Sequence, residues 1–447
     1  MLELDELEFD ILDLIKSHEF KKLKTFLETV HPVDLAEILE EFNDKNLVII
    51  FRLLPKEEAA ETFTNMNRDM QETLLQALNE EEIREVMEEL YLDDTVDILE
   101  EMPANVVDKL LDMTDADTRT RINELLNYPD DSAGSIMTVE YIALRKEMTV
   151  AESILKLRQI GINKETIYTC YVTEKRKLIG TVMLMDMLAS RDDETIEEIM
   201  ESHLISVHTD DNQEDVAKLT RKYHLLAIPV IDHEDCMVGI VTVDDAILVL
   251  QDETTEDINR MAAMLPTDES YFDTSVLMHV RNRLPWLLFL MLSATITGLI
   301  LTHYDPVIAI MPILVTVIPM LMGTGGNCGS QSSSLIIRGL SVDEIEFTDI
   351  FKIIYKECRI ALTVGITLAI INGIRVMIMY QNFELALMLG ISLIITILMA
   401  KLVGCSLPLL AVKLGLDPAI MAAPIITTLV DSGSMFILFQ IATIIYL

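Results

Sequence analysis

The sequence predicts a multidomain fold with an α-helical superhelical N-terminal domain, an α/β tandem domain pair, a connecting helix and a five-helix α transmembrane domain. Three observations predict this order: acidic amphipathic helices come first, a duplicated unit follows, and five long apolar runs end the chain. A chain of 447 residues is long enough for several units, because single cores rarely exceed about 300 residues. The predicted domains are 1–130, 131–193, 194–250, 251–280 and 281–447.

Charge is distributed unevenly along the chain. Residues 1–280 hold 64 of the 73 acidic residues and 25 of the 34 basic residues, whereas 281–447 hold nine of each. The formal net charge of −39 therefore lies on the first part. An acidic surface repels nucleic acid and concentrates cations, so metal ions are better candidate partners than DNA. The alternative is that this charge serves only solubility.

Several classes of protein are disfavoured. The five cysteines are far apart and form no CxxC pair, which argues against a disulfide framework or a thiolate zinc site. The N-terminal MLELDELEFD is acidic and does not resemble a signal peptide, so we expect membrane insertion through internal helices. No GxxxxGK[ST] phosphate loop occurs. We predict that the chain is not an enzyme.

Short amphipathic helices are predicted from about residue 8 to residue 128. Polar or proline-marked breaks separate them, and DLAEILEEF at 34–42 recurs loosely as DTVDILEEM at 94–102. Such spacing predicts stacked helical hairpins with apolar residues inward and carboxylates in water.

A second sequence pattern, of short β-rich runs alternating with helices, begins near residue 131 and occurs twice. The segment at 135–158 is echoed at 198–221, and LIGTVMLMDML at 178–188 is echoed by MVGIVTVDDAI at 237–247. This β-β-α unit resembles a pair of cystathionine-β-synthase-type (CBS) domains. The resemblance implies a regulatory pair that binds adenosine nucleotides such as ATP, or metal ions. Residues 244–265 contain no proline or glycine and predict one connecting helix.

Five apolar runs predict five membrane spans, at 284–304, 306–322, 360–380, 385–408 and 418–447. The first is 21 residues without a charge, which is long enough to cross about 30 Å of hydrocarbon. After Met322 the sequence becomes rich in glycine, serine, asparagine and glutamine. We expect a broken, polar re-entry at Gly323–Ser334, with carbonyls lining a cavity. The alternative is a flexible cytosolic loop.

Basic residues set the predicted topology, because Lys and Arg accumulate on the cytosolic side of short connections. They flank alternate ends of the spans: Arg281, Arg283, Arg338, Lys352, Lys356, Arg359 and Lys413. The connections near residues 303 and 381 contain none. The N-terminal half is therefore expected in the cytosol and the C-terminus outside, as in a multi-pass protein of the inner cell membrane.

The last span contains an acidic residue, Asp431. It shares a helical face with Pro424, Thr427 and Thr428, at i, i+3, i+4 and i+7. A carboxylate at membrane depth costs roughly 2.5 to 3.5 kcal/mol, so we expect it to face a water-filled path. The alternative is an ion pair with a buried base such as Arg375 or Lys401.

The chemistry of this stripe suits a hard cation. Mg²⁺ prefers oxygen ligands and loses water reluctantly, so one or two carboxylates with oriented carbonyls suffice to recognise the hydrated ion. Asn327 and Gln331 are expected to project amides into the same path. A sodium or proton relay would use the same ingredients, so the residues alone select a cation and not Mg²⁺.

Four segments resemble signatures of the MgtE family of Mg²⁺ channels and transporters: YPDDSAGSIMT at 128–138, RNRLPW at 281–286, GNCGSQSSSLIIRGL at 326–340 and LGLDPAIMAAPIITTLVDSGSMF at 414–436. The resemblance implies a homodimer with a pore at the dimer axis between the second and fifth membrane helices. It implies Asp431 as the selectivity carboxylate, with Asn327, Thr427 and Thr428 lining the pore. It also implies closure when cytosolic Mg²⁺ is high.

The same resemblance implies a set of cytosolic metal-binding residues. Asp417 matches the aspartate at the pore mouth. The predicted sensor acids are Glu253, Glu256 and Asp257 of the helix that plugs the pore, Glu214, Asp215 and Asp245 of the second CBS domain, and Asp93 and Asp97 of the helical domain. The chain departs from the family pattern at His224, Leu248 and Asn212, where acids are usual, so we expect fewer or rearranged sensor ligands.

The resulting hypothesis is a Mg²⁺-selective channel or transporter that imports Mg²⁺ and closes when Mg²⁺ binds the cytosolic domains. The membrane potential would drive import, at about 2.3 kcal/mol per charge per 100 mV. Expected partners are Mg²⁺, membrane lipid and a second copy of the chain, with no nucleic acid. One alternative is a transporter of Mn²⁺, Co²⁺ or another cation. Another is a CBS-regulated membrane receptor that conducts nothing.

Overall fold

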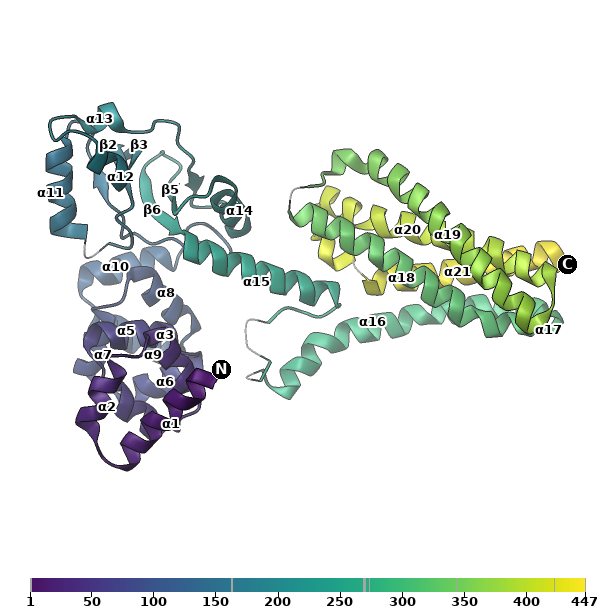
Figure 1. The fold of residues 1–447 in the computed structure, drawn as a ribbon, viewed down its shortest axis with the longest axis horizontal. Coiled ribbons are helices and arrows are strands. Elements are labelled where there is room, and N and C mark those ends of the chain that lie inside the picture. Colours follow the sequence, from purple (N-terminus) through teal and green to yellow (C-terminus); the bar gives the residue numbers. More distant parts are fainter. Residues whose placement is uncertain are drawn as a thin grey trace. The chain divides into compact units, whose positions relative to one another are not determined.

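The computed structural model describes residues 2–161, 164–267, 271–272, 274–342, 344–421 and 423–446. Two compact units divide the chain, 1–250 and 251–447. Figure 1 labels most of their elements.

The first unit begins with short helices. They are α1 (Leu2–Lys16), α2 (Phe20–Leu27), α3 (Pro32–Leu39), α4 (Asp44–Phe51), α5 (Lys56–Thr64), α6 (Arg68–Ala77), α7 (Glu80–Met87), α8 (Leu92–Glu101), α9 (Ala104–Met113) and α10 (Ala116–Leu125). Asparagine side chains cap several starts: Asn43 accepts from the Asn46 amide, and Asn79 forms a capping box with Glu82. Leucines such as Leu23, Leu39 and Leu74 are fully buried in one shared core. The predicted series of amphipathic helices is confirmed.

The duplicated unit folds as two sheets of the same topology. In the first, β2 (Thr169–Glu174) lies between parallel β1 (Ala143–Leu144) and antiparallel β3 (Lys177–Met183). In the second, β5 (Ala227–Ile231) lies between parallel β4 (Val207–His208) and antiparallel β6 (Met237–Thr242). The helices of the pair are α11 (Val150–Ile160), α12 (Leu184–Ala189), α13 (Ile196–Ile199) and α14 (Gln213–Tyr223).

The registers of the two sheets match as well. Val172 lies opposite Gly180, and Val230 lies opposite Gly239. A Cβ at Gly239 would lie 2.7 Å from the Thr138 carbonyl oxygen, so this glycine lets the preceding linker pair with β6. The repeat seen in the sequence is therefore a structural repeat, as predicted for a CBS pair.

The connecting helix α15 (Val243–Met261) follows β6. It begins one residue before the predicted helix at 244–265 and ends four residues earlier, where Ala263 adopts a left-handed φ of 56°. Helix α15 thus has one end in each of the two compact units.

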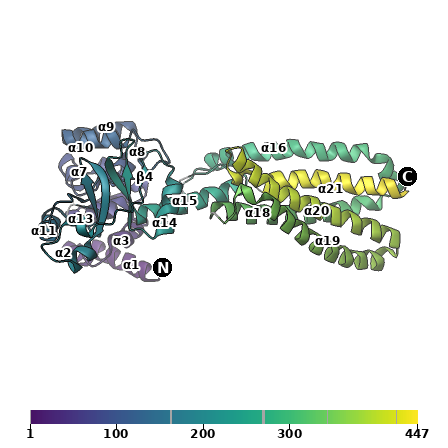
Figure 2. The ribbon, with the colours of Figure 1, turned by 90° about the horizontal axis from the view of Figure 1, so that it is seen from above.

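The second unit is a bundle of long helices, whose axes lie roughly alongside one another in Figure 2. Its elements are α16 (Val276–His303), α17 (Asp305–Ile310), α18 (Ile313–Ser341), η2 (Phe347–Asp349), α19 (Ile350–Tyr380), α20 (Phe383–Lys413), η3 (Pro418–Met421) and α21 (Ala423–Tyr446). Among the described residues, five helical stretches are long and apolar enough to span a membrane. The predicted number of spans is confirmed.

The predicted break in the second span is wrong. Helix α18 continues without interruption through Gly323–Ser334 to Ser341. An unbroken helix keeps the backbone hydrogen bonds of a membrane segment satisfied, and small residues let neighbouring helices approach closely. Gly325 and Gly329 are buried against α20 and α21, where added Cβ atoms would contact Val430 and Ile426. The glycines therefore serve helix packing, and the loop alternative is also wrong.

Candidate ion path and acidic clusters

The carboxylate of Asp431 on α21 lies against the backbone of α18. A Cβ added at Gly326 would be 3.1 Å from the Thr427 Cγ2 atom and 3.9 Å from the Asp431 Oδ1 atom. A larger residue than glycine would have to displace these side chains. The glycine segment of α18 thus brings the Asp431 carboxylate close to the other helix that the sequence predicted to line the path.

Neither Lys401 nor Arg375, the two bases considered as partners from the sequence, pairs with Asp431. Lys401 instead pairs with Glu357, with 3.2 Å between Nζ and Oε2. Arg375 donates through Nε to the Asn372 Oδ1 atom at 3.1 Å. The ion-pair alternative for Asp431 is therefore wrong for both bases.

The two threonines near Asp431 bond to their own helix. The hydroxyls of Thr427 and Thr428 each donate to the carbonyl oxygen of Pro424 at 3.0 Å. This arrangement uses their protons, and it leaves lone pairs of both hydroxyl oxygens as acceptors. The predicted sharing of one helical region by these residues is borne out, and the oxygens are available to a cation or its water shell.

One face of α18 is polar and exposed in the single chain. Gly323, Asn327, Gln331 and Ser334 are exposed on it, whereas Gly325, Gly329 and Ser332 are buried on the other side. An amide that faces hydrocarbon loses its hydrogen bonds to water, which is costly. This face therefore requires water or another protein surface at membrane depth.

A second acidic residue of the spans, Glu357, lies in a buried network. Glu357 and Lys401 have side chains only 9% and 7% exposed. The Ser332 hydroxyl donates to Glu357 Oε2 at 2.6 Å, and Lys401 Nζ donates to the Ser332 Oγ atom at 3.0 Å. The network joins α18, α19 and α20, so it holds the helix with the exposed amide face in place. Sequence reasoning missed it.

The predicted pore-mouth aspartate also has a basic partner. Arg260, near the end of α15, forms ion pairs with both Glu256 and Asp417. Asp417 accepts a second bond from the Ala419 amide at 2.7 Å, and Met261 packs against Ile337 and Ala419. The end of α15 is thus fastened to the start of the segment that leads into α21. Arg260 was not predicted, because its partner is 157 residues away in the sequence.

A cluster of carboxylates lies where α8 meets the CBS pair. Burial, followed by the charges of Asp94, Glu165 and Asp245, raises the pKa of Asp93 to about 8. Burial and neighbouring acids also raise the pKa of Asp94 to about 6 and that of Glu165 to about 7. The Asp93 Oδ1 and Glu165 Oε2 atoms are buried without hydrogen-bond partners. We call Asp93, Asp94, Glu165 and Asp245 the seam cluster.

Sequence reasoning found Asp93 and Asp245 of the seam cluster and missed Asp94 and Glu165. The signal for Asp94 was its adjacency to Asp93 on one helical turn, but nothing in the sequence marked Glu165. The Asp245 carboxylate accepts a hydrogen bond from the Thr242 hydroxyl, and burial raises its pKa.

The other predicted sensor acids do not form a cluster like the seam cluster. Glu214 pairs with Lys218 at 2.8 Å, and Asp215 and Asp97 are exposed. Glu253 and Asp257 are half-buried on α15 with Glu256. In the part of the chain that the structure describes, no three His, Cys, Asp or Glu side chains converge closely enough to hold a metal ion. His224, at one of the departures from the family pattern, ends α14 with a left-handed φ of 54°.

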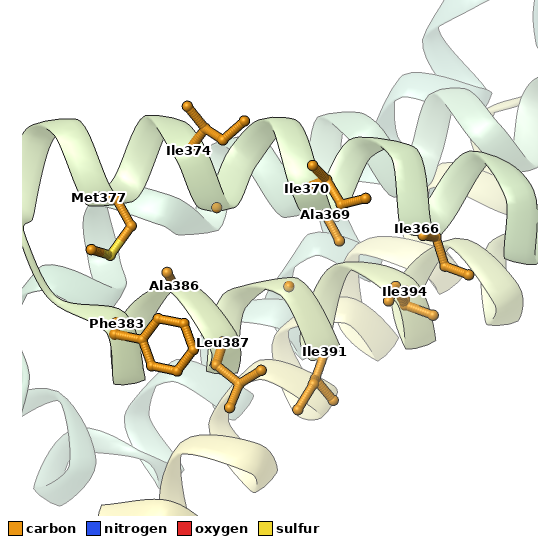
Figure 3. Close-up of a pocket in the computed structure, with 12 residues that line it drawn as sticks. Ile366, Ala369, Ile370, Ile374, Met377, Phe383, Ala386, Leu387, Ile391 and Ile394 are labelled. Atoms are coloured by element: carbon orange, nitrogen blue, oxygen red, sulfur yellow. The ribbon is translucent and has the colours of Figure 1, made fainter.

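A groove between α19 and α20 is apolar throughout. Figure 3 shows its walls, which include Ile370, Ile374, Met377, Phe383 and Leu387. Its volume is about 370 Å³. It offers no oxygen ligand from a side chain, so it is not a candidate cation site.

Three family models match separate parts of the chain. A model described as divalent cation transporter matches residues 318–441, an MgtE intracellular N domain matches 30–131, and a CBS domain matches 196–252. The chain is 35% identical to the magnesium transporter MgtE of Thermus thermophilus over 444 residues, which is 98% of both proteins. The chain belongs to the MgtE family.

Further MgtE relatives agree with this assignment. The magnesium transporter MgtE of Bacillus subtilis is 31% identical over 98% of this chain and 97% of that protein. Among solved structures, the cytosolic domain of the Mg²⁺ channel MgtE in complex with ATP is 36% identical, with a TM-score of 0.52. It covers 54% of this chain and 99% of that one. The soluble part of a magnesium transporter is 30% identical with a TM-score of 0.53, over 56% and 99%. The relatives are transporters, which is not a class of enzymes.

Proposed function

We propose that this MgtE-family chain carries Mg²⁺ into the cell through a pore in which Asp431 selects the ion, and that Mg²⁺ bound on the cytosolic side closes it. Transport of Mg²⁺ is the activity named for its full-length relatives. The observation that carries the site assignment is the position of Asp431. It is a membrane carboxylate without a basic partner among the candidates, set against the glycine segment of α18. A hydrated divalent ion supplies the missing positive charge.

The pore is proposed to form between two copies of the chain. Asn327 and Gln331 form an exposed amide face at membrane depth, which a second copy and a water-filled path would cover. Helix α16 contains no buried residue and touches α21 through the Thr297–Ser432 hydrogen bond of 3.1 Å. A homodimer, surrounded by lipid on its outer helices, accounts for both exposed surfaces.

The proposed orientation places the acidic first unit in the cytosol and the C-terminus outside. Its support is the distribution of Lys and Arg, which avoid the connections near residues 303 and 381. The proposed functional division follows the sequence: 1–130 and the CBS domains 131–193 and 194–250 sense Mg²⁺, 251–280 transmits, and 281–447 conducts.

The gate is proposed to be the end of α15. Arg260 already fastens this helix to Asp417, and Glu253, Glu256 and Asp257 lie on the same element. Mg²⁺ shared by these acids and Asp417 would add to the ion pair and hold the helix at the mouth. A two-state gate needs about 5.5 kcal/mol of differential binding to move from 1:99 to 99:1, so several weak sites together are sufficient.

The seam cluster is proposed as one of those sites. No three of its carboxylates converge closely enough to hold a bare ion, so Mg²⁺ would be held there with its water shell by one or two of them. The carboxylates of the cluster repel one another and leave two oxygens without partners, so a cation that entered would relieve both. Glu214, Asp215 and Asp97 would act at the periphery, through hydrated ions. Binding at the seam would favour the arrangement in which α8 packs on the CBS pair.

A regulatory nucleotide is a second proposed ligand of the CBS pair. Its support is the solved structure of the cytosolic domain of the Mg²⁺ channel MgtE in complex with ATP, which is 36% identical to this chain. We expect ATP to bind the full-length protein and to change the Mg²⁺ concentration that closes it. Titration of ATP during a flux assay tests this.

Flux into proteoliposomes with Mg²⁺, Mn²⁺ and Co²⁺ tests the proposed function. We expect Mg²⁺ flux by the native chain and loss of at least 100-fold in Asp431→Ala. The matched control is Glu384→Ala, which removes an exposed acid at the start of α20. Preference for Mn²⁺ or Co²⁺ would establish the other-cation alternative, and absence of any flux would support a receptor.

A further inference from the structure

Arg375 is a base in a membrane span that the proposed ion path does not use. It lies in the apolar run of α19, and its side chain is exposed. Of the nine basic residues at 281–447, seven flank the predicted cytosolic connections, and Lys401 is paired with Glu357. In the part of the chain that the structure describes, Arg375 forms hydrogen bonds to neutral groups and no ion pair. Its positive charge is therefore not compensated within this chain.

The position of Arg375 along α19 places it at the edge of the hydrocarbon. A helix of 31 residues is about 46 Å long, whereas the hydrocarbon is about 30 Å thick. A helix centred in the membrane therefore extends beyond the hydrocarbon by about 8 Å at each end. Arg375 lies five residues before Tyr380, the last residue of α19, which is also about 8 Å. The guanidinium thus lies at the depth where the lipid head groups begin.

Two helices hold the guanidinium in one position. Its Nε atom donates to the Asn372 Oδ1 atom at 3.1 Å, and its Nη2 atom donates to the Met320 Sδ atom of α18 at 3.3 Å. A guanidinium has five N–H donors, so three remain after these two bonds. Asn372 is only 6% exposed, and within the described structure its Nδ2 atom has no hydrogen-bond partner. Donors gather here without matching acceptors, which favours an oxyanion.

The neighbours of Arg375 on its helical face are apolar. Ile371, Ile378 and Met379, at i−4, i+3 and i+4, are 58%, 75% and 61% exposed. Apolar side chains exposed on a membrane span are covered by lipid chains rather than by water. A free anion would gain nothing from this surface, whereas a phospholipid brings a phosphate and apolar chains together. The face therefore suits a lipid better than a dissolved ion.

We propose that Arg375 binds the phosphate group of a phospholipid, whose chains lie along the exposed face of α19. The lipid belongs to the leaflet opposite the basic connections, which is the outer leaflet in the proposed orientation. A guanidinium pairs with two phosphate oxygens at once, and such charge-assisted bonds are stronger than neutral ones. Because the guanidinium also contacts Met320, a bound lipid connects α19 to α18. The proposal rests on the membrane position of α19 and not on which ion is transported.

The test is native mass spectrometry of the full-length protein in detergent, titrated with phosphatidylglycerol. We expect Arg375→Gln to weaken binding of the first lipid by about tenfold, because its charge-assisted bonds are lost. The matched control is Arg359→Gln, which leaves this first step unchanged. Arg359 is exposed near the other end of the same helix, and its guanidinium lies over the ring of Tyr355 of that helix. Thermal unfolding without added lipid verifies that each variant is folded.

Two further ligands identify the group that Arg375 recognises. Diacylglycerol with the same chains lacks the phosphate, so it should bind the native chain and Arg375→Gln equally. Inorganic phosphate lacks the chains, and we expect no measurable binding. Equal affinity of the native chain and Arg375→Gln for phosphatidylglycerol, or equal losses in Arg375→Gln and Arg359→Gln, overturns the proposal. Binding of inorganic phosphate that Arg375→Gln abolishes also overturns it, because the site then takes a free anion.

A carboxylate of a second copy of the chain is the competing partner for Arg375. Conversion of a dimer to a monomer by Arg375→Gln, with phosphatidylglycerol affinity unchanged, would assign the guanidinium to that contact and overturn the lipid site. Mg²⁺ flux of Arg375→Gln in proteoliposomes is expected to stay within about threefold of the native chain. Absence of flux in the native chain would refute transport and leave the lipid titration unchanged, so the two failures are distinguishable.

Discussion

Glu357 and Asp431 are both carboxylates of membrane-spanning helices, but their surroundings are opposite. Glu357 is buried with Lys401 and Ser332, and its charge is neutralised inside the protein. Asp431 lies against the glycine segment of α18, and neither nearby candidate base reaches it. The difference teaches that partner and position, rather than residue type or depth, separate the neutralised Glu357 from Asp431, the carboxylate that we propose is open to a transported cation.

The same contrast occurs among acids outside the long apolar helices. Asp417 is paired with Arg260, whereas Asp93 and Glu165 of the seam cluster have buried oxygens without partners. Paired acids hold helices together in this chain, and we propose that the acids with partnerless buried oxygens bind a cation. The predictions below test this division, from the largest expected effect to the smallest.

The largest effect is expected from breaking the buried pair. Lys401→Met leaves Glu357 charged and unpaired, which should cost roughly 3–5 kcal/mol of stability in the membrane domain. The double variant Glu357→Gln with Lys401→Met should recover most of that loss, because no buried charge remains. Thermal unfolding in detergent measures both. A double variant as unstable as the single one would contradict a structural role for the pair.

Loss of the ion pair at the mouth should release the gate. Arg260→Ala removes the basic partner of Asp417 and is expected to raise the open probability at low Mg²⁺ several-fold. Single-channel recording measures the open probability. The charge-matched control is Arg221→Ala, which removes an arginine from the last turn of α14 instead of from α15. Unchanged open probability would mean that the pair has no role in holding α15.

Neutralising the acids of α15 should weaken closure by Mg²⁺. Replacing Glu253, Glu256 and Asp257 by their amides is expected to shift the closing concentration of Mg²⁺ upward by about tenfold, because the element nearest the mouth loses its ligands. Protease protection of the first unit against Mg²⁺ concentration provides an independent measure. Superimposable curves would assign these acids to solvation of the helix alone.

The seam cluster makes the effect of Mg²⁺ depend on pH. Because the pKa values of Asp93, Asp94 and Glu165 are raised to about 8, 6 and 7, the folded state binds more protons than the unfolded state. Stability without Mg²⁺ should therefore fall as pH rises from about 4 to 8. Mg²⁺ competes with these protons, so its stabilising effect on thermal unfolding should be larger at pH 8 than at pH 6. Asp94→Asn with Glu165→Gln should flatten this dependence.

The sequence predicted the elements well because they follow from local patterns. Hydropathy predicted the number of spans, although the second one, predicted at 306–322, is the helix Ile313–Ser341. The echo of 178–188 at 237–247 matches the shared strand order of the two sheets. The prediction of a break in α18 was wrong because glycine in a sequence has two meanings. It can end a helix, or it can let a neighbouring helix approach closely. At Gly325 and Gly329 the helix continues, and the missing side chains let α21 pack closely against α18.

The partners of charged residues could not be predicted in the same way. Glu357 and Lys401 are 44 residues apart, and Arg260 and Asp417 are 157 apart. Only the folded chain brings them together. Asp431 could be predicted as a candidate site residue because it is an acid within an apolar run, and such a run is visible in the local sequence. Glu165 carries no such signal, and only the folded chain brings it near Asp94 and Asp245.

The most direct test compares Mg²⁺ flux of two charge-neutralised proteins in the same proteoliposome assay. One is Asp431→Asn, and the other is Glu357→Gln with Lys401→Met. The account predicts that Asp431→Asn loses at least 100-fold of the flux while its thermal stability is retained, and that the double variant keeps flux within about threefold of the native chain. Full flux in Asp431→Asn, or equal loss in both proteins, would contradict the claim that Asp431 is the carboxylate that selects the ion.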